Sequence, residues 1–277
     1  MPEIELIGCN HYYETAGEGQ ALIFIHGAFV DSKLWGTQWD FFSYRYHVVR
    51  YDLRGHGKTG PSKPRSYSIT TFADDLKALV DKLGLPQPIL CGLSLGGMIA
   101  QEYAVRHPQD LQALILADTA VSVSLTLSDK VQRYVLFPRW LLRLTIKRMS
   151  VEGFTRFSFW LAKNTRSEDW LGRDEETRKY IRSEMLAMDE QEYLKIYDAI
   201  YGFKLLPLER IICPTLVLNG EYEPASVFRH TTEVLKRVPH AESAVVQGAG
   251  HTSNRENAPA FNQNVASFLK KHSHSQH

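Results

Sequence analysis

The sequence has few cysteines, almost no net charge and no long apolar stretch. Its three cysteines, Cys9, Cys91 and Cys213, lie far apart and form no C-x-x-C pair, so we expect neither a disulfide framework nor a zinc site. The 32 Lys and Arg residues against 31 Asp and Glu residues leave a net charge of +1, which gives no overall field that favours nucleic acid or an anionic membrane. No run reaches the roughly 18 apolar residues of a membrane-spanning helix.

Signals for cofactors and for export are also lacking. The chain has no phosphate-binding P-loop and no cluster of His and Asp with metal-ligand spacing. Residues Met1–Asn10 contain neither the basic nor the apolar segment of a secretion signal. We therefore expect a cytoplasmic protein with no cofactor, no metal, no nucleic-acid partner and no stable membrane insertion, whose partner is a small-molecule substrate. Its oligomeric state is not predicted.

The composition is that of an ordinary globular protein. The chain has 277 residues, of which 44% are hydrophobic and 23% charged. This length suits one or two domains with a well-buried core.

Short apolar runs alternate with helical patterns along most of the chain. Such runs are typical of strands buried on both faces of a parallel sheet, and the alternation indicates a doubly wound α/β architecture. The predicted strands are Ala21–His26, Tyr46–Tyr51, Pro88–Cys91, Ala113–Ala117, Thr215–Leu218 and Ala244–Gln247. The predicted helices are Thr71–Leu83, with Thr71 as a plausible N-cap, Leu95–His107, Ala225–Val238 and Pro259–Lys271.

The segment from Val121 to Pro207 has a different character. It contains no strand-like run and is rich in Arg, Leu and aromatic residues, which favours several helices that either cover the sheet as a cap or extend the core. Five basic residues in it could dock an acidic carrier protein or a membrane surface, or form a solvated helix face. They are Arg133, Arg139, Arg143, Lys147 and Arg148.

The sharpest local motif is Gly92-Leu93-Ser94-Leu95-Gly96-Gly97, which follows a predicted strand and opens a predicted helix. A serine in this G-x-S-x-G context sits on a tight turn that exposes its hydroxyl. The neighbouring glycines let the helix and the strand approach closely. The motif therefore predicts a nucleophilic serine at position 94.

Together with four further stretches, this motif resembles the α/β-hydrolase family. His26-Gly27-Ala28-Phe29 is similar to the oxyanion-hole loop, Asp52–Thr59 to the D-x-R-G-x-G turn, and Gly250-His251 with Glu256 and Pro259–Asn262 to the catalytic-histidine loop and closing helix. The resemblance covers residues 5–120 and 208–270. It implies a mostly parallel eight-stranded sheet, with a hydrolase core of residues 1–120 and 208–277 and a helical cap of residues 121–207.

The chemistry requires a base and an acid beside the serine. His251 is the candidate base, because imidazole titrates near working pH and can take the hydroxyl proton. The resemblance places the acid after the strand at Thr215, commonly as Asp, and this sequence has Glu223 there. Asp118, at the end of another strand, and Glu221 remain alternative acids.

The resemblance also implies an oxyanion hole formed by the backbone N–H groups of Ala28 and Leu95, or of Phe29 in place of Ala28 if the loop is shifted. Phe29 and Trp35 are possible pocket residues, and Trp35 could equally lie in the core. The expected activity is that of a carboxylesterase-like serine hydrolase of small-to-medium esters, thioesters or lactones, acting through an acyl-enzyme on Ser94. One alternative is C–C hydrolysis, perhydrolysis or lyase chemistry on the same triad. Another is a hydrolase-like ligand receptor with little turnover.

Overall fold

The computed structural model describes residues 2–272 except 132–133, 135–137 and 166–171. Its centre is one eight-stranded sheet with the order β1-β2-β4-β3-β5-β6-β7-β8. The pairs β1/β2 and β2/β4 are antiparallel, and the five other neighbouring pairs are parallel. The predicted fold class, a doubly wound and mostly parallel α/β sheet, is confirmed.

The central strands are buried along their whole length. Every residue of β3, β5, β6 and β7 is buried, as their unbroken apolar runs predict. The strands are β1 (Glu3–Leu6), β2 (Cys9–Ala16), β3 (Ala21–Ile25), β4 (His47–Tyr51), β5 (Ile89–Leu93), β6 (Ala113–Ala117), β7 (Thr215–Gly220) and β8 (Ala241–Val246).

Helices cover both faces of the sheet. On one face, α2 (Ile69–Lys82), α3 (Leu95–Arg106) and α8 (Ala225–Arg237) pack against the strands, together with the short η3 (Leu208–Arg210). On the other face lie η1 (Ser32–Trp35), α1 (Gly36–Phe42), α9 (Ser253–Glu256) and α10 (Ala258–His272). The two layers correspond to two separate clusters of buried apolar side chains.

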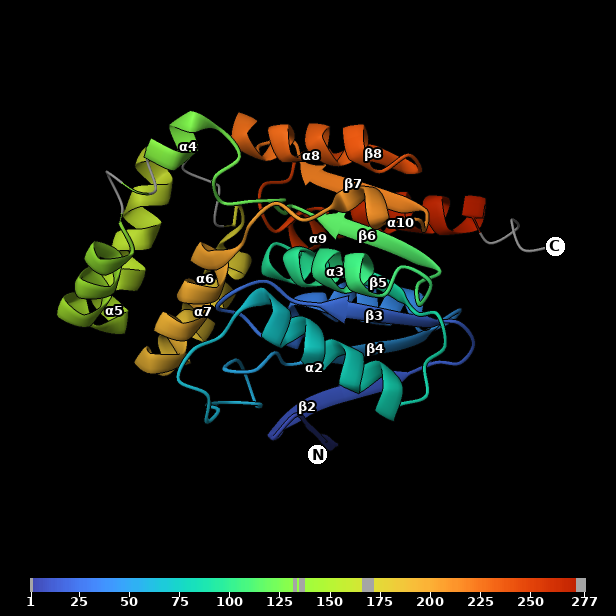
Figure 1. Ribbon diagram of the computed structural model, residues 1–277, viewed down its shortest axis with the longest axis horizontal. Coiled ribbons are helices and arrows are strands. Elements are labelled where there is room, and N and C mark those ends of the chain that lie inside the picture. The colour runs from blue at the N-terminus through green and yellow to red at the C-terminus, as the bar shows by residue number, and fades with distance from the viewer. Residues whose placement is uncertain (1, 132–133, 135–137, 166–171, 273–277) are drawn as a thin grey trace.

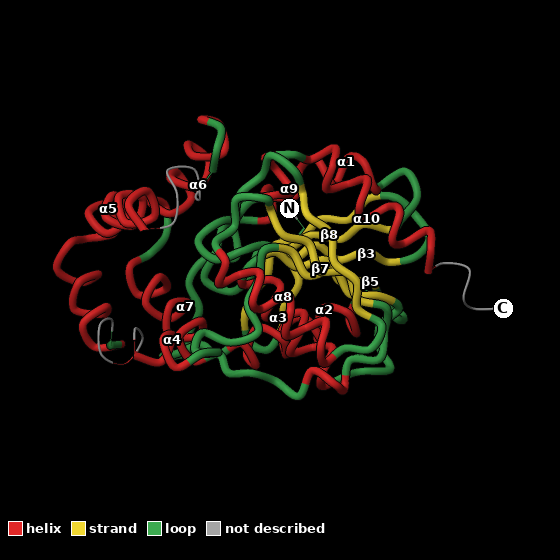
Figure 2. Tube along the Cα trace, turned by 90° about the horizontal axis from the view of Figure 1, so that it is seen from above, coloured by secondary structure: helices red, strands yellow, loops and turns green. Residues whose placement is uncertain are grey.

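Among the described residues, four α-helices precede η3 in the segment between β6 and β7. They are α4 (Leu127–Val131), α5 (Arg139–Thr165), which is interrupted at Ser150, α6 (Glu175–Ala187) and α7 (Glu190–Gly202). Figures 1 and 2 both place them to one side of the sheet, and in Figure 1 the strands β6 and β7 point toward them. The described residues of the predicted cap contain no strand. The division into core and cap domains stays a prediction.

Three details differ from the sequence prediction. The N-terminal strands β1 and β2 were not predicted from the residues. The last strand begins at Ala241 rather than Ala244. The N-cap of α2 is Ser68 rather than Thr71: the Ser68 hydroxyl accepts a hydrogen bond from Thr71 N at 3.1 Å, and the Thr71 hydroxyl accepts one from Ser68 N at 3.3 Å. This reciprocal pair is a capping box, which starts the helix three residues earlier.

The cysteines are all buried free thiols. Burial raises the pKa of the Cys91 thiol, which keeps it protonated and unreactive. In the part of the chain that the structure describes, no helix is both long and apolar enough to cross a membrane.

Candidate active site

Ser94 lies at the sharp turn between β5 and α3. Its backbone has φ of 54° and ψ of −112°, a conformation that L-residues rarely adopt outside strained turns. Two glycines make the turn possible: a Cβ at Gly92 would lie 2.3 Å from Gly96 O, and a Cβ at Gly96 would lie 2.1 Å from Ile25 O. The G-x-S-x-G pattern is therefore a packing requirement as well as a chemical signal.

Ser94, His251 and Glu223 meet at the carboxyl ends of the strands. His251 Nε2 lies 3.1 Å from Ser94 Oγ, and His251 Nδ1 lies 2.5 Å from Glu223 Oε1. Because a carboxylate only accepts, Nδ1 carries the proton and Nε2 is left to accept from the serine hydroxyl. The Glu223 side chain is fully buried, whereas the imidazole is 16% exposed. The structure thus brings together the three residues that the sequence proposed.

The acid and base loops are held against each other by their backbones. Tyr222 N donates to Ala249 O at 3.0 Å, and Glu221 N donates to Val246 O, at the end of β8, at 3.1 Å. A Cβ at Gly220 would lie 2.1 Å from Gly250 O, so only glycine permits this approach. The alternative acid Glu221 lies on the same loop but accepts from Gly248 N at 2.8 Å.

Glu256 supports the histidine loop from α9. Its carboxylate accepts from Gly250 N at 2.5 Å and from the Thr252 hydroxyl at 2.6 Å, and these two residues flank His251. The sequence resemblance includes Glu256 without giving it a role. Its position five residues after the histidine, at the end of the short α9, is the signal for this role.

Asp118 does not occupy the position of the triad acid. It follows β6 and is 1% exposed. Its Oδ1 accepts from Gly220 N at 2.8 Å, and its Oδ2 accepts from Ser253 N at 3.2 Å and from the Ser253 hydroxyl at 2.5 Å. Burial, and then the neighbouring Glu223 carboxylate, raise the pKa of Asp118.

The predicted oxyanion loop lies next to the serine. A Cβ built at Gly27 would be 3.5 Å from Ser94 Cβ, and the following residues Ala28 and Phe29 are half-buried. Leu95 is the first residue of α3, where backbone N–H groups point away from the helix. The roles of the Ala28 and Leu95 N–H groups stay predictions.

His26 fixes the start of this loop. Its Nε2 accepts from Leu53 N at 2.9 Å, and its Nδ1 lies 2.8 Å from Gly27 O. Burial lowers the pKa of His26, so the ring is neutral, with the proton on Nδ1. His26 is therefore a structural hydrogen-bonding group at the start of the loop.

Aromatic side chains join the oxyanion loop to the inserted helices. The Phe29 ring stacks on Tyr193 of α7 with centroids 4.0 Å apart, and Phe154 of α5 meets Tyr193 edge-on at 5.7 Å. For Trp35, which the sequence left open between the pocket and the core, the structure shows the core. Trp35 is fully buried in the core, stacked on Phe24, and has no surface left for a substrate.

A cavity of about 280 Å³ lies between the core and the inserted helices, and Ser94, His251 and Glu223 are not among the residues that line it. It is bounded by the loop after β3, including Asp31 and Lys33, by the turn after β4, and by Glu184 at the end of α6. Asp31 also binds the inserted helices, because the Tyr180 hydroxyl donates to its Oδ1 at 2.7 Å. Although burial opposes it, the hydrogen bonds from Tyr180 and Lys33 lower the pKa of Asp31.

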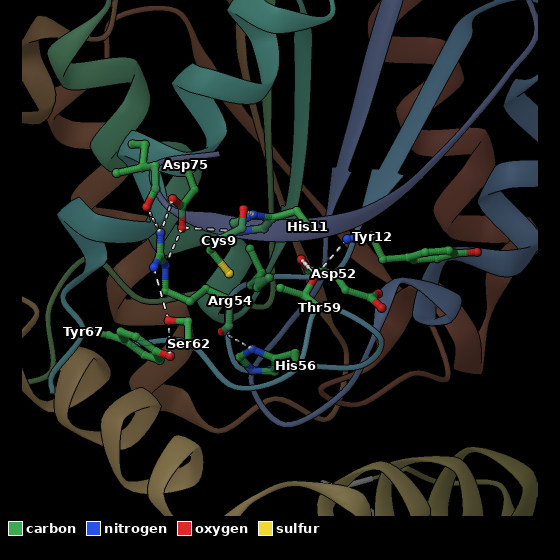
Figure 3. Close-up of polar contacts among 12 residues, drawn as sticks. Cys9, His11, Tyr12, Asp52, Arg54, His56, Thr59, Ser62, Tyr67 and Asp75 are labelled. Atoms are coloured by element: carbon green, nitrogen blue, oxygen red, sulfur yellow. Dashed lines mark hydrogen bonds and ion pairs between the residues drawn. The ribbon is translucent and has the colours of Figure 1, made fainter. Parts of the chain in front are cut away.

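The D-x-R-G-x-G turn is a buried structural unit (Figure 3). Arg54 Nη2 and Nε bind the two oxygens of Asp75 at 2.6 and 2.9 Å, and both side chains are 1% exposed. His56 lies 3.0 Å from Arg54 O through Nδ1, and burial lowers its pKa well below the usual value. The Arg54–Asp75 pair anchors the loop after β4 to α2.

The basic residues of the inserted segment are partly paired. Arg139 and Arg143 bind the two oxygens of Asp198 at 2.7 and 2.5 Å. Lys147 and Arg148 are exposed, and Arg133 lies outside the described residues. Docking of an acidic carrier here stays a prediction. Within the described ranges, no group of three or more His, Cys, Asp or Glu is placed to hold a metal ion.

Comparisons with known proteins agree with this architecture. The model of the alpha/beta hydrolase fold matches residues 20–258. The chain is 27% identical to 3-oxoadipate enol-lactonase 2 of Acinetobacter baylyi, over 94% of this chain and 92% of that protein. It is also 27% identical to the putative 2-succinyl-6-hydroxy-2,4-cyclohexadiene-1-carboxylate synthase of Bacillus subtilis, over 93% and 94%. The solved enol-lactonase of Burkholderia xenovorans LB400 is 25% identical, with a TM-score of 0.81, over 97% of this chain and 100% of that one.

Proposed function

The chain belongs to the alpha/beta hydrolase fold family, and from this premise we propose that it is a serine hydrolase of small-to-medium carboxylic esters, thioesters or lactones. The observation that carries the proposal is the continuous contact from Ser94 through His251 to Glu223. Similarity to proteins named as lactonases supports hydrolysis of an ester-type bond.

The first step is attack by the serine. Ser94 Oγ forms a bond to the carbonyl carbon while His251 Nε2 takes the hydroxyl proton. Glu223 remains ionised and stabilises the imidazolium through Nδ1–H. The carbonyl oxygen becomes an oxyanion, which the N–H groups of Ala28 and Leu95 bind from the oxyanion loop and the start of α3.

The second step releases the alcohol or thiol. The imidazolium of His251 gives its proton to the leaving atom as the bond to the carbonyl carbon breaks, which leaves the acyl group on Ser94. For a lactone, the leaving alkoxide stays attached to the acyl chain. Water then attacks the acyl-enzyme with His251 as base, and the product acid leaves with Ser94 restored.

A second candidate is carbon–carbon or elimination chemistry on the same triad. The relative from Bacillus subtilis that is named as a synthase favours this possibility. In that case, His251 and Ser94 would move a proton of the substrate without a stable acyl-enzyme.

Labelling combined with turnover tests the proposal. A fluorophosphonate probe should modify Ser94, located by peptide mass spectrometry, and the same protein should release p-nitrophenol from short-chain p-nitrophenyl esters. Heat-denatured protein is the control for non-specific labelling. Labelling of Ser94 without ester or lactone turnover would contradict the hydrolase proposal and favour a ligand receptor or the second chemistry.

A further inference from the structure

Asp118 lies at a junction of the segments that hold the proposed triad. It directly follows β6, the strand between β5, which leads to Ser94, and β7, which leads to Glu223. Its backbone has φ of 46°, in the left-handed region that non-glycine residues rarely adopt, and its side chain is almost completely buried. The backbone is therefore strained at Asp118, the residue whose carboxyl group forms this junction.

The two oxygens of Asp118 bind two different loops. Oδ1 accepts from the backbone N–H of Gly220, three residues before Glu223. Oδ2 accepts from the backbone N–H and the hydroxyl of Ser253, two residues after His251. One side chain therefore connects the loop that carries the acid to the loop that carries the base.

The next residue extends the same junction to the nucleophile. The Thr119 hydroxyl donates to Ser94 O at 2.6 Å, and Ser94 N donates to Ala117 O at 2.9 Å. The end of β6 consequently contacts the backbone of all three segments: the turn at Ser94, the acid loop and the base loop.

We propose that Asp118 is a positioning residue for the reaction: by holding Gly220 and Ser253 on its two oxygens, it keeps the Glu223 carboxylate in contact with the His251 ring behind Ser94. This inference rests on the proposed serine mechanism. Asp118 acts through the other residues and does not itself touch the substrate.

Holding these loops matters because the acid and the base follow different strands. Glu223 follows β7 and His251 follows β8, so their contact depends on how the two loops sit against each other. In oriented catalysis, a displacement of about 1 Å can reduce the rate by about 100-fold. Loss of the Asp118 carboxyl group would remove one shared contact from both loops at once and leave two buried backbone N–H groups without this acceptor.

The pH dependence of the reaction reports on this contact. Carboxylates that face or flank the His251 ring are Glu223 from the acid loop, Asp118 from β6, and Glu221 and Glu256, which bind the backbone of the base loop. Arg255, on α9, lies over the Tyr180 ring. A looser contact with Glu223 stabilises the imidazolium less, so the acid limb of the activity profile should move to lower pH.

The experiment compares Asp118→Ala and Asp118→Asn with wild type. The fraction of protein that a fluorophosphonate has labelled at completion gives the concentration of active sites. The kcat per site, the KM and the pH profile are then measured with p-nitrophenyl butyrate. Asn keeps an acceptor for Gly220 N and can donate to the Ser253 hydroxyl, so it should restore part of the activity. Asp75→Asn, in the buried pair with Arg54, is the control for a general loss of stability.

For Asp118→Ala we expect kcat per site to fall about 10- to 100-fold, with KM changed less than about 3-fold. The acid limb should move to lower pH, and Asp118→Asn should lie between Ala and wild type. Asp75→Asn should lower the melting temperature while keeping kcat per site. An unchanged kcat per site in Asp118→Ala, with wild type labelled and active, would overturn this inference alone. A wild type that is not labelled at Ser94 would overturn the proposed function and this inference with it.

Discussion

A glutamate contacts the ring of His251, whereas the family that the sequence resembles commonly uses an aspartate there. Gly220 lets the acid loop approach the base loop closely, and in this arrangement the Glu223 carboxylate lies 2.5 Å from His251 Nδ1. The carboxylate is fully buried, so its charge acts on the imidazole with little screening by solvent. At the residue scale, the proposed mechanism therefore depends on the negative charge of Glu223.

Replacing Glu223 by Gln removes that charge at nearly constant shape. The imidazolium loses its anionic partner and the ring its preferred tautomer, so we expect kcat to fall about 10³- to 10⁴-fold. Steady-state kinetics on a p-nitrophenyl ester measure the loss. Glu221→Gln, on the same loop, is the control and should change kcat by less than about 3-fold. If Asp118→Asn proves more damaging than Glu223→Gln, the acid has been misassigned.

Buried His56 should make the fold sensitive to acid. Burial depresses its pKa well below 6.5 in the folded state, so the unfolded chain binds a proton that the folded chain does not. The stability that this histidine contributes is therefore present above pH 6.5 and is lost as the pH falls below it. Urea unfolding between pH 8 and 5 should show a steeper loss for wild type than for His56→Gln. Parallel curves for the two proteins would contradict this assignment.

Sequence patterns located the candidate site residues better than the residues that hold them in place. Ser94 and His251 each follow a strand in a glycine-containing motif, and this local signal is visible in a single chain. The partners of Asp118 lie 102 and 135 positions away, at Gly220 and Ser253, and no local pattern indicates such contacts. Whether Trp35 lines a pocket or the core could not be predicted for the same reason, because the position of an aromatic residue near a motif does not tell how deeply it is buried.

At the scale of elements, continuous apolar runs predicted the central strands, whereas β1 and β2 gave no such signal. In β2, exposed and half-buried residues interrupt the buried ones, and the buried His11 lies 3.5 Å from Asp75 of α2. A polar residue such as His11, which is buried beside a partner distant in the sequence, interrupts the apolar pattern by which a strand is predicted. The hairpin at the sheet edge was therefore missed although the rest of the sheet was predicted.

The start of α2 offers a test at the same scale. Ser68→Ala removes the hydroxyl that accepts from Thr71 N, and this should reduce the free energy of unfolding by about 1 kcal/mol. Urea denaturation measures the change. Ser66→Ala, an exposed position just before the helix, is the control and should change stability by less than about 0.5 kcal/mol. Equal effects of the two substitutions would contradict the capping box.

At the scale of the whole molecule, the candidate catalytic residues follow strands of the sheet, and the inserted helices contact the predicted oxyanion loop. Phe29 comes from the loop after β3, whereas Phe154 and Tyr193 come from α5 and α7. Contacts between segments so distant in sequence leave no local pattern. This explains why five ordered motifs sufficed to predict the fold, while the identity of the substrate could not be predicted from them.

The most direct test of the central claim is the kcat/KM of Ser94→Ala for a p-nitrophenyl ester, measured on protein whose circular dichroism matches that of wild type. If Ser94 is the nucleophile, kcat/KM should fall by at least about 10³-fold, because no acyl-enzyme can form. A folded variant whose kcat/KM stays within about tenfold of wild type would show that the reaction does not proceed through this hydroxyl.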